Sequence, residues 1–450
     1  MKKGIAFTLV ALVMGMGLMF TTSHAVTYNT GFQVINMSDT TVANIVIHYY
    51  DQAGAEAVTP APTDQIPAGG SKTYFPIHPT STFNGSVVIE SDQPISAIAN
   101  TLGDGDQYGA SSNGFTGGAT TINLPLLMKG NAGFDTWFNV QNTGSADATV
   151  TVTYNPGAIP DPQNGVVIKP GAAKTFNQAD VAALAAGFVG SAVVTSTQPV
   201  VATVMQVGTG GTKSLLAYNS FTTGSTTVKL PLVQANNFGF FTGIQAMNTG
   251  TLPTDITITY GPNTVAGGAT PAAESCTAVQ PGQSCTKIQL NGQWSFQYVG
   301  AANITNSAAQ PLVAITNQLT LAGKGSAYEG FNPTAATLTA VAPLVMANNF
   351  GYFTGVQVQN VGTGNCDFTV KYSPNTVSSA IGTPINETAT AVAPGASFTF
   401  LQLGGQWTDR YVGGANVTGT GAGCLVAAIV NELNNGAAGD LLFTYNATNK

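Results

Sequence analysis

An asparagine closes the same short apolar phrase at four places in this chain, and these places are 106, 106 and 112 residues apart. The phrases GFQVIN, WFNVQN, GIQAMN and GVQVQN end at Asn36, Asn142, Asn248 and Asn360. In each phrase apolar residues alternate with polar ones, which is typical of a strand with one buried face. A repeat of this length is too long for a solenoid unit and suits a complete β-sandwich. We therefore predict one module written four times.

Other motifs recur in the same order within each repeat. An aromatic residue followed by any residue, Gly and a small residue occurs at Phe83, Phe188, Tyr298 and Tyr411. Repeats 2 to 4 also begin with an apolar strand that contains a proline, at Pro125, Pro231 and Pro343. Proline there predicts an edge strand or a kink. Repeat 1 has only VTYNT in that place.

The number of short strands and the spacing of the turns favour an immunoglobulin-like sandwich in each repeat. Together with the Q-P and L-P-L phrases, these motifs resemble the tandem immunoglobulin-like repeats of bacterial exported surface proteins. The resemblance implies a structural or adhesive role and brings no catalytic residues with it. We expect an all-β chain of four domains, at residues 26–117, 118–223, 224–333 and 334–450, stacked as an elongated rod of about 140 Å. One short helix is expected within residues 177–187.

The first 25 residues have the pattern of a secretory signal peptide. Lys2 and Lys3 precede an apolar run over residues 5–20, and Ser23-His24-Ala25 is a small-residue cleavage site. The alternative, a membrane anchor, is disfavoured because the run is short and no basic cluster follows it. We expect cleavage after Ala25, an extracellular or cell-surface location, and no membrane span in the mature chain.

Charged residues make up only 7% of the chain, against about 25% in an ordinary soluble protein. The 20 acidic residues outnumber the 13 basic ones, and no basic cluster follows the leader. Nucleic acid is therefore excluded as an expected partner, because it requires clustered Lys and Arg. The neutral polar surface offers little repulsion between molecules.

All four cysteines follow the leader, and an exported chain favours disulfides. Of the three possible connectivities we expect Cys276–Cys285, within one loop, and Cys366–Cys424, within repeat 4. Metal ligation is the alternative, and it requires closer Cys and His spacing than the sequence has.

No residue pattern predicts catalysis or a cofactor site. His48 and His78 lie outside any nucleophile motif, and His48 is expected to face outward beside Tyr49. The few acidic residues do not suggest a catalytic carboxylate pair. Asp104 and Asp106 resemble part of a calcium loop but lack the other ligands, so a solvated turn is favoured and no metal site is expected.

The three tryptophans are candidates for a sugar-binding platform. Trp294 and Trp407 recur at matching positions, which favours core packing, whereas Trp137 occurs once. The leading hypothesis is a non-enzymatic exported structural protein of the cell envelope, in a surface layer, sheath or filament. It would self-associate or bind other envelope components. The alternative is a monomeric adhesin or carbohydrate-binding surface protein, with glycans as partners.

Overall fold

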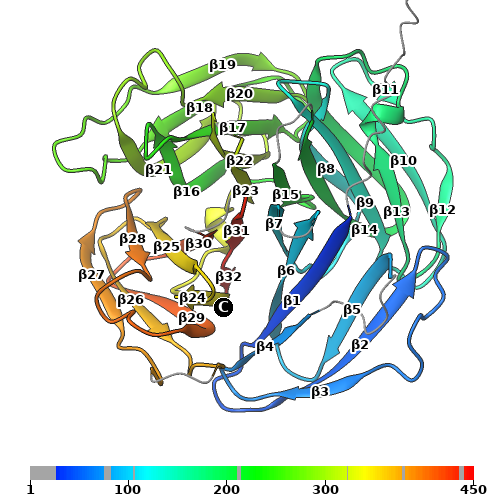
Figure 1. The fold of residues 1–450 in the computed structure, drawn as a ribbon. Coiled ribbons are helices and arrows are strands. Elements are labelled where there is room, and N and C mark those ends of the chain that lie inside the picture. The colour runs from blue at the N-terminus through cyan, green and yellow to red at the C-terminus, as the bar shows by residue number, and fades with distance from the viewer. Residues whose placement is uncertain are drawn as a thin grey trace, which may run out of the picture.

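The fold is almost entirely β, as predicted (Figure 1). It is known from a computed structural model, which describes residues 27–75, 83–104, 107–209, 214–321, 323–377, 381–434 and 440–450. We name the strand groups module 1 (β1–β7), module 2 (β8–β15), module 3 (β16–β23) and module 4 (β24–β32). Each is built from antiparallel strands.

The first two modules contain fifteen strands. Module 1 comprises β1 (Tyr28–Asn36), β2 (Ala43–Asp51), β3 (Thr63–Ile66), β4 (Ser71–Tyr74), β5 (Gly85–Ser91), β6 (Ile95–Gly103) and β7 (Tyr108–Asn113). Module 2 comprises β8 (Ala119–Lys129), β9 (Phe134–Asn142), β10 (Ala148–Asn155), β11 (Ile159–Pro160), β12 (Val166–Ile168), β13 (Ala173–Asn177), β14 (Phe188–Gly208) and β15 (Leu215–Asn219).

The last two modules contain seventeen. Module 3 comprises β16 (Thr227–Ala235), β17 (Phe240–Asn248), β18 (Thr254–Tyr260), β19 (Glu274–Val279), β20 (Ser284–Ile288), β21 (Tyr298–Asn306), β22 (Leu312–Thr320) and β23 (Gly325–Glu329). Module 4 comprises β24 (Thr339–Ala347), β25 (Tyr352–Asn360), β26 (Cys366–Tyr372), β27 (Glu387–Val392), β28 (Ser397–Leu401), β29 (Tyr411–Thr420), β30 (Val426–Asn434), β31 (Leu442–Asn446) and β32 (Thr448–Asn449).

Each module has two β layers around its own apolar core. The inner layers have the strand orders β4-β1-β6-β7, β13-β9-β14-β15, β20-β17-β22-β23 and β28-β25-β30-β31. The outer layers are β3-β2-β5 in module 1, β16-β21-β18-β19 in module 3 and β27-β26-β29-β24-β32 in module 4. In module 2 the long strand β14 runs through both layers and joins them.

The four modules form a closed ring, so the predicted rod is wrong. Strands β7, β15, β23 and β31 stand together at the centre of the molecule (Figure 1). Each of them contacts the next, and β31 of the last module contacts β7 of the first. The prediction failed because short linkers limit the distance between neighbouring modules but leave open the angle at which they join. That angle is decided by side chains that contact one another across the junctions.

The repeated asparagine holds the turn after the first inner strand of each module. Asn142 donates through Nδ2 to the carbonyls of Ala146 and Ile168 at 2.8 and 2.9 Å, and its Oδ1 accepts from the Gly144 amide at 2.8 Å. Asn248 and Asn360 make the equivalent bonds. The asparagine is buried in all four copies, so its side chain supplies the partners that a buried turn needs.

Helical structure is confined to two 3-10 turns among the described residues. The helix expected within residues 177–187 is only the turn η1 (Gln178–Asp180), capped by the side chain of Asn177. A second turn, η2 (Pro333–Ala335), precedes β24. Gln178 is buried and bonds to Thr136 and Tyr154, so tertiary contacts replace the continuation of the helix.

Candidate binding face

The centre of the ring is closed by polar side chains at the ends of the four central strands. Asn219 donates to the carbonyl of Asn113 at 2.7 Å, Asn113 donates to that of Asn446 at 2.6 Å, and Asn446 donates to that of Glu329 at 2.8 Å. The fourth member cannot continue this pattern, because a carboxylate has no proton to donate. Instead, the backbone amide of Asn219 donates to the Glu329 carboxylate. Burial raises the pKa of Glu329 to about 7.

A second set of polar pairs joins neighbouring modules beside the centre. Gln206 and Asn317 exchange two hydrogen bonds across modules 2 and 3, and Gln318 and Asn431 do so across modules 3 and 4. At the junction of modules 4 and 1 the glutamine is replaced by Glu432, which accepts from Asn100 at 3.0 Å. Glu432 is only 1% exposed, and burial raises its pKa to about 8.

One residue of module 4 contacts all three other modules. The Asp440 carboxylate accepts from Ser214 Oγ at 2.6 Å and from the Gly325 amide at 2.7 Å, while its own amide donates to the Gln107 carbonyl at 2.8 Å. Burial raises the pKa of Asp440 to about 7, against the opposing effects of these bonds and of Lys324. These three carboxyl groups are therefore engaged in joining modules.

The cysteines pair as expected from the sequence. Cys276 is joined to Cys285, and Cys366 to Cys424. Both bridges lie within single modules, so they secure a loop and a core and do not close the ring.

Those candidate ligand and metal residues that the structure describes do not come together. Trp294 and Trp407 are buried in the cores of modules 3 and 4, as predicted, and Trp137 packs against Tyr28 at the junction of modules 1 and 2. His48 lies on the outer face of β2 and contacts Glu56 at 2.7 Å. Asp104 accepts from the Thr27 amide and the Tyr108 hydroxyl. His78 and Asp106 lie outside the described residues.

Two turns at one end of the ring expose phenylalanine to solvent. The sequence Asn-Asn-Phe-Gly occurs at residues 236–239 and 348–351, and it joins β16 to β17 and β24 to β25. Phe238 is 91% exposed and Phe350 is 78% exposed. Both have left-handed backbones, with φ of 51° and 53°. A bulky residue in this conformation is uncommon and strained, so each turn carries two unfavourable features.

Module 2 shows that the turn does not need the aromatic ring. Ala132 occupies the place of Phe238 there, with a φ of 49° and a following glycine in the same conformation. The bridge of Asn131 to Phe134 also matches that of Asn237 to Phe240. The two rings are therefore available for a purpose other than forming the turn.

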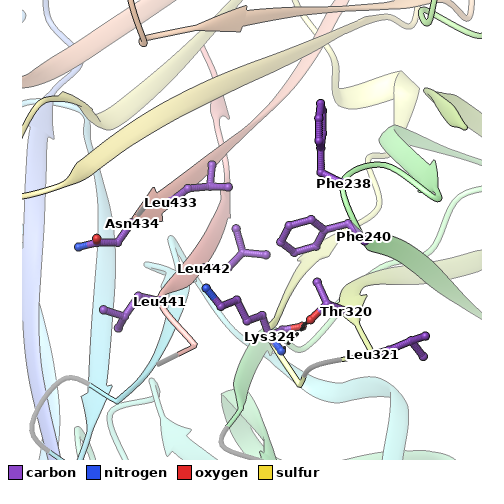
Figure 2. Close-up of a pocket in the computed structure, with 10 residues that line it drawn as sticks. Phe238, Phe240, Thr320, Leu321, Lys324, Leu433, Asn434, Leu441 and Leu442 are labelled. Atoms are coloured by element: carbon purple, nitrogen blue, oxygen red, sulfur yellow. Dashed lines mark hydrogen bonds between the residues drawn. The ribbon is translucent and has the colours of Figure 1, made fainter. Parts of the chain in front are cut away.

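An apolar pocket of about 510 Å³ adjoins the first of these turns, between modules 3 and 4. Its apolar lining comes from both modules and comprises Phe238, Phe240, Leu321, Leu433, Leu441 and Leu442. Figure 2 shows Phe240, Leu433 and Leu442 around a common space, with the Lys324 side chain reaching along it. Leu321 at the rim is 83% exposed.

The second turn is linked to this pocket through one lining residue. The Asn434 side chain lines the pocket and donates to the Phe350 carbonyl at 3.4 Å. The Arg410 guanidinium lies over the Phe350 ring, 4.3 Å from its centre, and so holds a charge beside an aromatic face. We call Phe238, Leu321, Phe350 and the pocket between them the binding face.

The sequence contains one signal for this face. The phrase NNFG appears twice at the same place in the repeat, where a turn needs no large apolar residue. The exposure of the two phenylalanine side chains follows only from the direction in which their turns project from the ring of modules.

The described residues show no group of three or more His, Cys, Asp or Glu side chains able to hold a metal ion. No helix in this part of the chain has the length and apolar character needed to cross a membrane. Searches against protein-family models, curated proteins and solved structures found no match to this chain.

Proposed function

We propose that this protein is a non-enzymatic adhesin of the cell surface, exported by its N-terminal signal and made of four immunoglobulin-like modules. It binds another macromolecule of the cell envelope through the binding face. The observation that carries this proposal is the pair of strained, solvent-exposed phenylalanines beside an apolar pocket. An export leader, two disulfides and the resemblance of the repeats to surface proteins support the location.

In the unbound protein, the two exposed phenylalanine side chains carry an unfavourable free energy. Each leaves its apolar surface in water, and burying a phenylalanine side chain is worth about 1.5–3 kcal/mol. Ala132 adopts the same left-handed conformation in module 2 without exposing an aromatic ring, so the turn does not require that exposure. A partner that covers both rings and fills the pocket would remove the exposure. Clusters of exposed apolar groups on a soluble surface are typical of interaction sites.

The absence of an enzyme motif in the sequence agrees with this proposal. Glu329, Glu432 and Asp440 have the raised pKa values that often accompany catalysis, but each bonds across a junction between modules. Burial of these carboxyl groups at the junctions raises their pKa values, so no substrate is needed to explain them.

The test is sedimentation of the purified protein with isolated cell envelopes from its source. The double variant Phe238→Ala/Phe350→Ala should bind at least about tenfold more weakly. Burial of one phenylalanine is worth about 1.5–3 kcal/mol, and a tenfold change in affinity corresponds to about 1.4 kcal/mol. Leu252→Ala is the matched control, since Leu252 is 58% exposed in the turn at the opposite end of β17. Equal binding by the double variant and the unchanged protein would reject the binding face.

A structural role in an assembled envelope layer is the second candidate. The observation that favours it is the low charge of the surface, which leaves little repulsion between copies. Electron microscopy of the concentrated protein should then show sheets or fibres. Single rings at every concentration would reject this second role.

A further inference from the structure

Among the described residues, module 1 has no counterpart of one strand that the other three modules contain. In modules 2, 3 and 4 the proline-containing strands β8, β16 and β24, here called lead strands, pair with β14, β21 and β29. In module 1 the strand that corresponds to β14, β21 and β29 is β5. Among the described residues, β5 pairs only with β2. In the part of the chain that the structure describes, no strand pairs with the other edge of β5.

The open edge leaves the core of module 1 incomplete. Val87 and Ile89 of β5 are only half-buried, although the residues at their places in the other modules are buried: Ala192, Val194, Ala302, Ile304, Ala415 and Val417. The same holds on the facing layer for Ile95, Ala97 and Ala99 of β6. In module 2 the space is filled by Ile122, Leu124 and Leu127 of the lead strand. The described residues of module 1 thus include none of the apolar side chains that a lead strand supplies.

The neighbouring module forms the opposite wall of the same space. The lead strands β8, β16 and β24 each contact the first inner strand of the next module, which is β17, β25 and β1 respectively. For module 1 that neighbour is β9. Asn139 and Gln141 of β9 are half-buried, whereas their counterparts are buried: Gln33, Ile35, Gln245, Met247, Gln357 and Gln359. We call the space between β5 and β9 the β5 slot.

Module 2 presents a shorter amide side chain where Gln33 and Gln357 bond to a lead strand. Where a lead strand is present, the carbonyl of its proline accepts a bond from the next module: Pro343 from Gln33, Pro231 from Gln357 and Pro125 from Ser284. At the junction of modules 1 and 2 the glutamine is replaced by Asn139 and the serine by Ala173. Asn139 keeps an amide donor but is one methylene shorter than glutamine, so its side chain reaches less far toward the slot.

We propose that the β5 slot binds an extended strand of a partner protein, with apolar side chains at alternate positions, antiparallel to β5. The three filled copies define this chemistry, since their occupants place alternate apolar residues between the layers. Strand addition to an open edge supplies main-chain bonds, and the alternate side chains supply selectivity. A second copy of this chain is disfavoured because its described strands are already paired. The proposal does not depend on the binding face.

A cross-linking experiment tests the register that the other modules predict. Val88 takes the place of Val193 and Asn303, which lie opposite Asn123 and Lys229 of the lead strands. The probe is a synthetic peptide with the sequence of β16, TVKLPLVQA, in which cysteine replaces Lys229. The exported chain carries Val88→Cys, its only free thiol once both disulfides have formed. The yield of the disulfide between this peptide and the protein should be at least tenfold higher than the yield with a peptide whose cysteine replaces Val228.

Hydrogen exchange supplies the second measurement. The amides of β5 should exchange rapidly in the protein alone and slow at least tenfold when the peptide without cysteine is added. A scrambled peptide should give no protection. Phe238→Ala/Phe350→Ala should bind the peptide as the unchanged protein does, so a failure of the binding face is distinguished from a failure of the slot.

Three results would overturn the proposal. Equal cross-linking in both registers would show that the peptide does not add as a strand. Slow exchange of the β5 amides without peptide would show that the chain already fills the slot. Tighter binding by a peptide of residues 15–23, the chain's own preceding segment, would assign the slot to the unprocessed precursor and not to a partner.

Discussion

Asn113 and Asn446 lie 333 positions apart, and the side chain of Asn113 bonds to the backbone of Asn446 through both its nitrogen and its oxygen. The Asn113 Nδ2 donates to the Asn446 carbonyl at 2.6 Å, and the Asn446 amide donates to the Asn113 Oδ1 at 2.9 Å. This exchange connects the last strand of the inner layer of module 4 to the last strand of module 1. The ring is therefore closed by specific bonds as well as by apolar contact.

Asn113→Ala should weaken the closure of the ring. The substitution leaves the amide and the carbonyl of Asn446 without these partners, and an unsatisfied buried group costs about 1–3 kcal/mol. The free energy of unfolding, measured in a urea titration, should fall by that amount. Asn44→Ala is the control, because Asn44 is exposed and bonds to Asp92 at the surface. A loss no greater than that of the control would mean that the bond exchange contributes nothing to closure.

Glu432→Gln should reduce the dependence of stability on pH. The pKa of Glu432 is raised from 4.5 to about 8 in the folded protein, so the group binds its proton more tightly when folded. Its favourable contribution is complete below about pH 4.5 and is lost as the pH rises through about 8. Glutamine, which modules 2 and 3 have at this place, does not titrate.

The measurement is the free energy of unfolding between pH 5 and pH 9. The unchanged protein should lose stability over this range, and Glu432→Gln should lose less, with the two curves separating most at the alkaline end. Asp180→Asn, at an exposed position in η1, should follow the unchanged protein. Parallel curves for Glu432→Gln and the unchanged protein would contradict the assignment.

The two disulfides should differ in what they contribute. Cys366 and Cys424 are 58 residues apart, whereas Cys276 and Cys285 are 9 apart. Loop-closure entropy predicts losses of about 4 and about 3 kcal/mol when the pairs are replaced by alanine, because a longer loop gains more freedom on unfolding. Denaturant titration of the two double variants gives the order. A greater loss for the Cys276–Cys285 pair would show that the entropy of the unfolded chain does not decide the difference.

Phe238→Gly should not destabilise the protein. Glycine adopts the left-handed conformation without strain, and the exposed ring contributes no buried contact, so the free energy of unfolding should stay level or rise by up to about 1 kcal/mol. Phe241→Ala should lower the free energy of unfolding by about 3–5 kcal/mol. Phe241 is only 9% exposed, and removing its ring leaves a cavity. Calorimetry of both variants checks the contrast. A large loss for Phe238→Gly would mean that its ring packs within the protein.

Local patterns in the sequence were enough for the strands and the cores. The alternation around Asn142 and its equivalents predicts strands with one buried face, and these strands are present. The matching positions of Trp294 and Trp407 predict burial, and both are buried. Such predictions succeed because alternation and turn residues act over a few neighbouring positions.

The same reasoning could not find the binding face or the polar centre. Phe238 looks like any apolar residue near a strand, and only the direction of its turn exposes it. Asn113 and Glu329 end ordinary strands, and their importance appears only when four strand ends meet. The short helix within residues 177–187 was overestimated because Gln178 is bonded to Thr136 and Tyr154, which belong to other elements.

By itself, the order of residues determined that this chain forms β layers, that it does so four times, and which parts of each copy lie inside. Whether the copies form a line or a circle was decided by tertiary structure. The physical reason is distance along the chain: Asp440 bonds to Ser214 and Gly325, and Asn446 to Asn113, between segments that no local pattern connects. Such contacts together set the angle at each junction between modules. The ring is closed because modules 4 and 1 also contact each other.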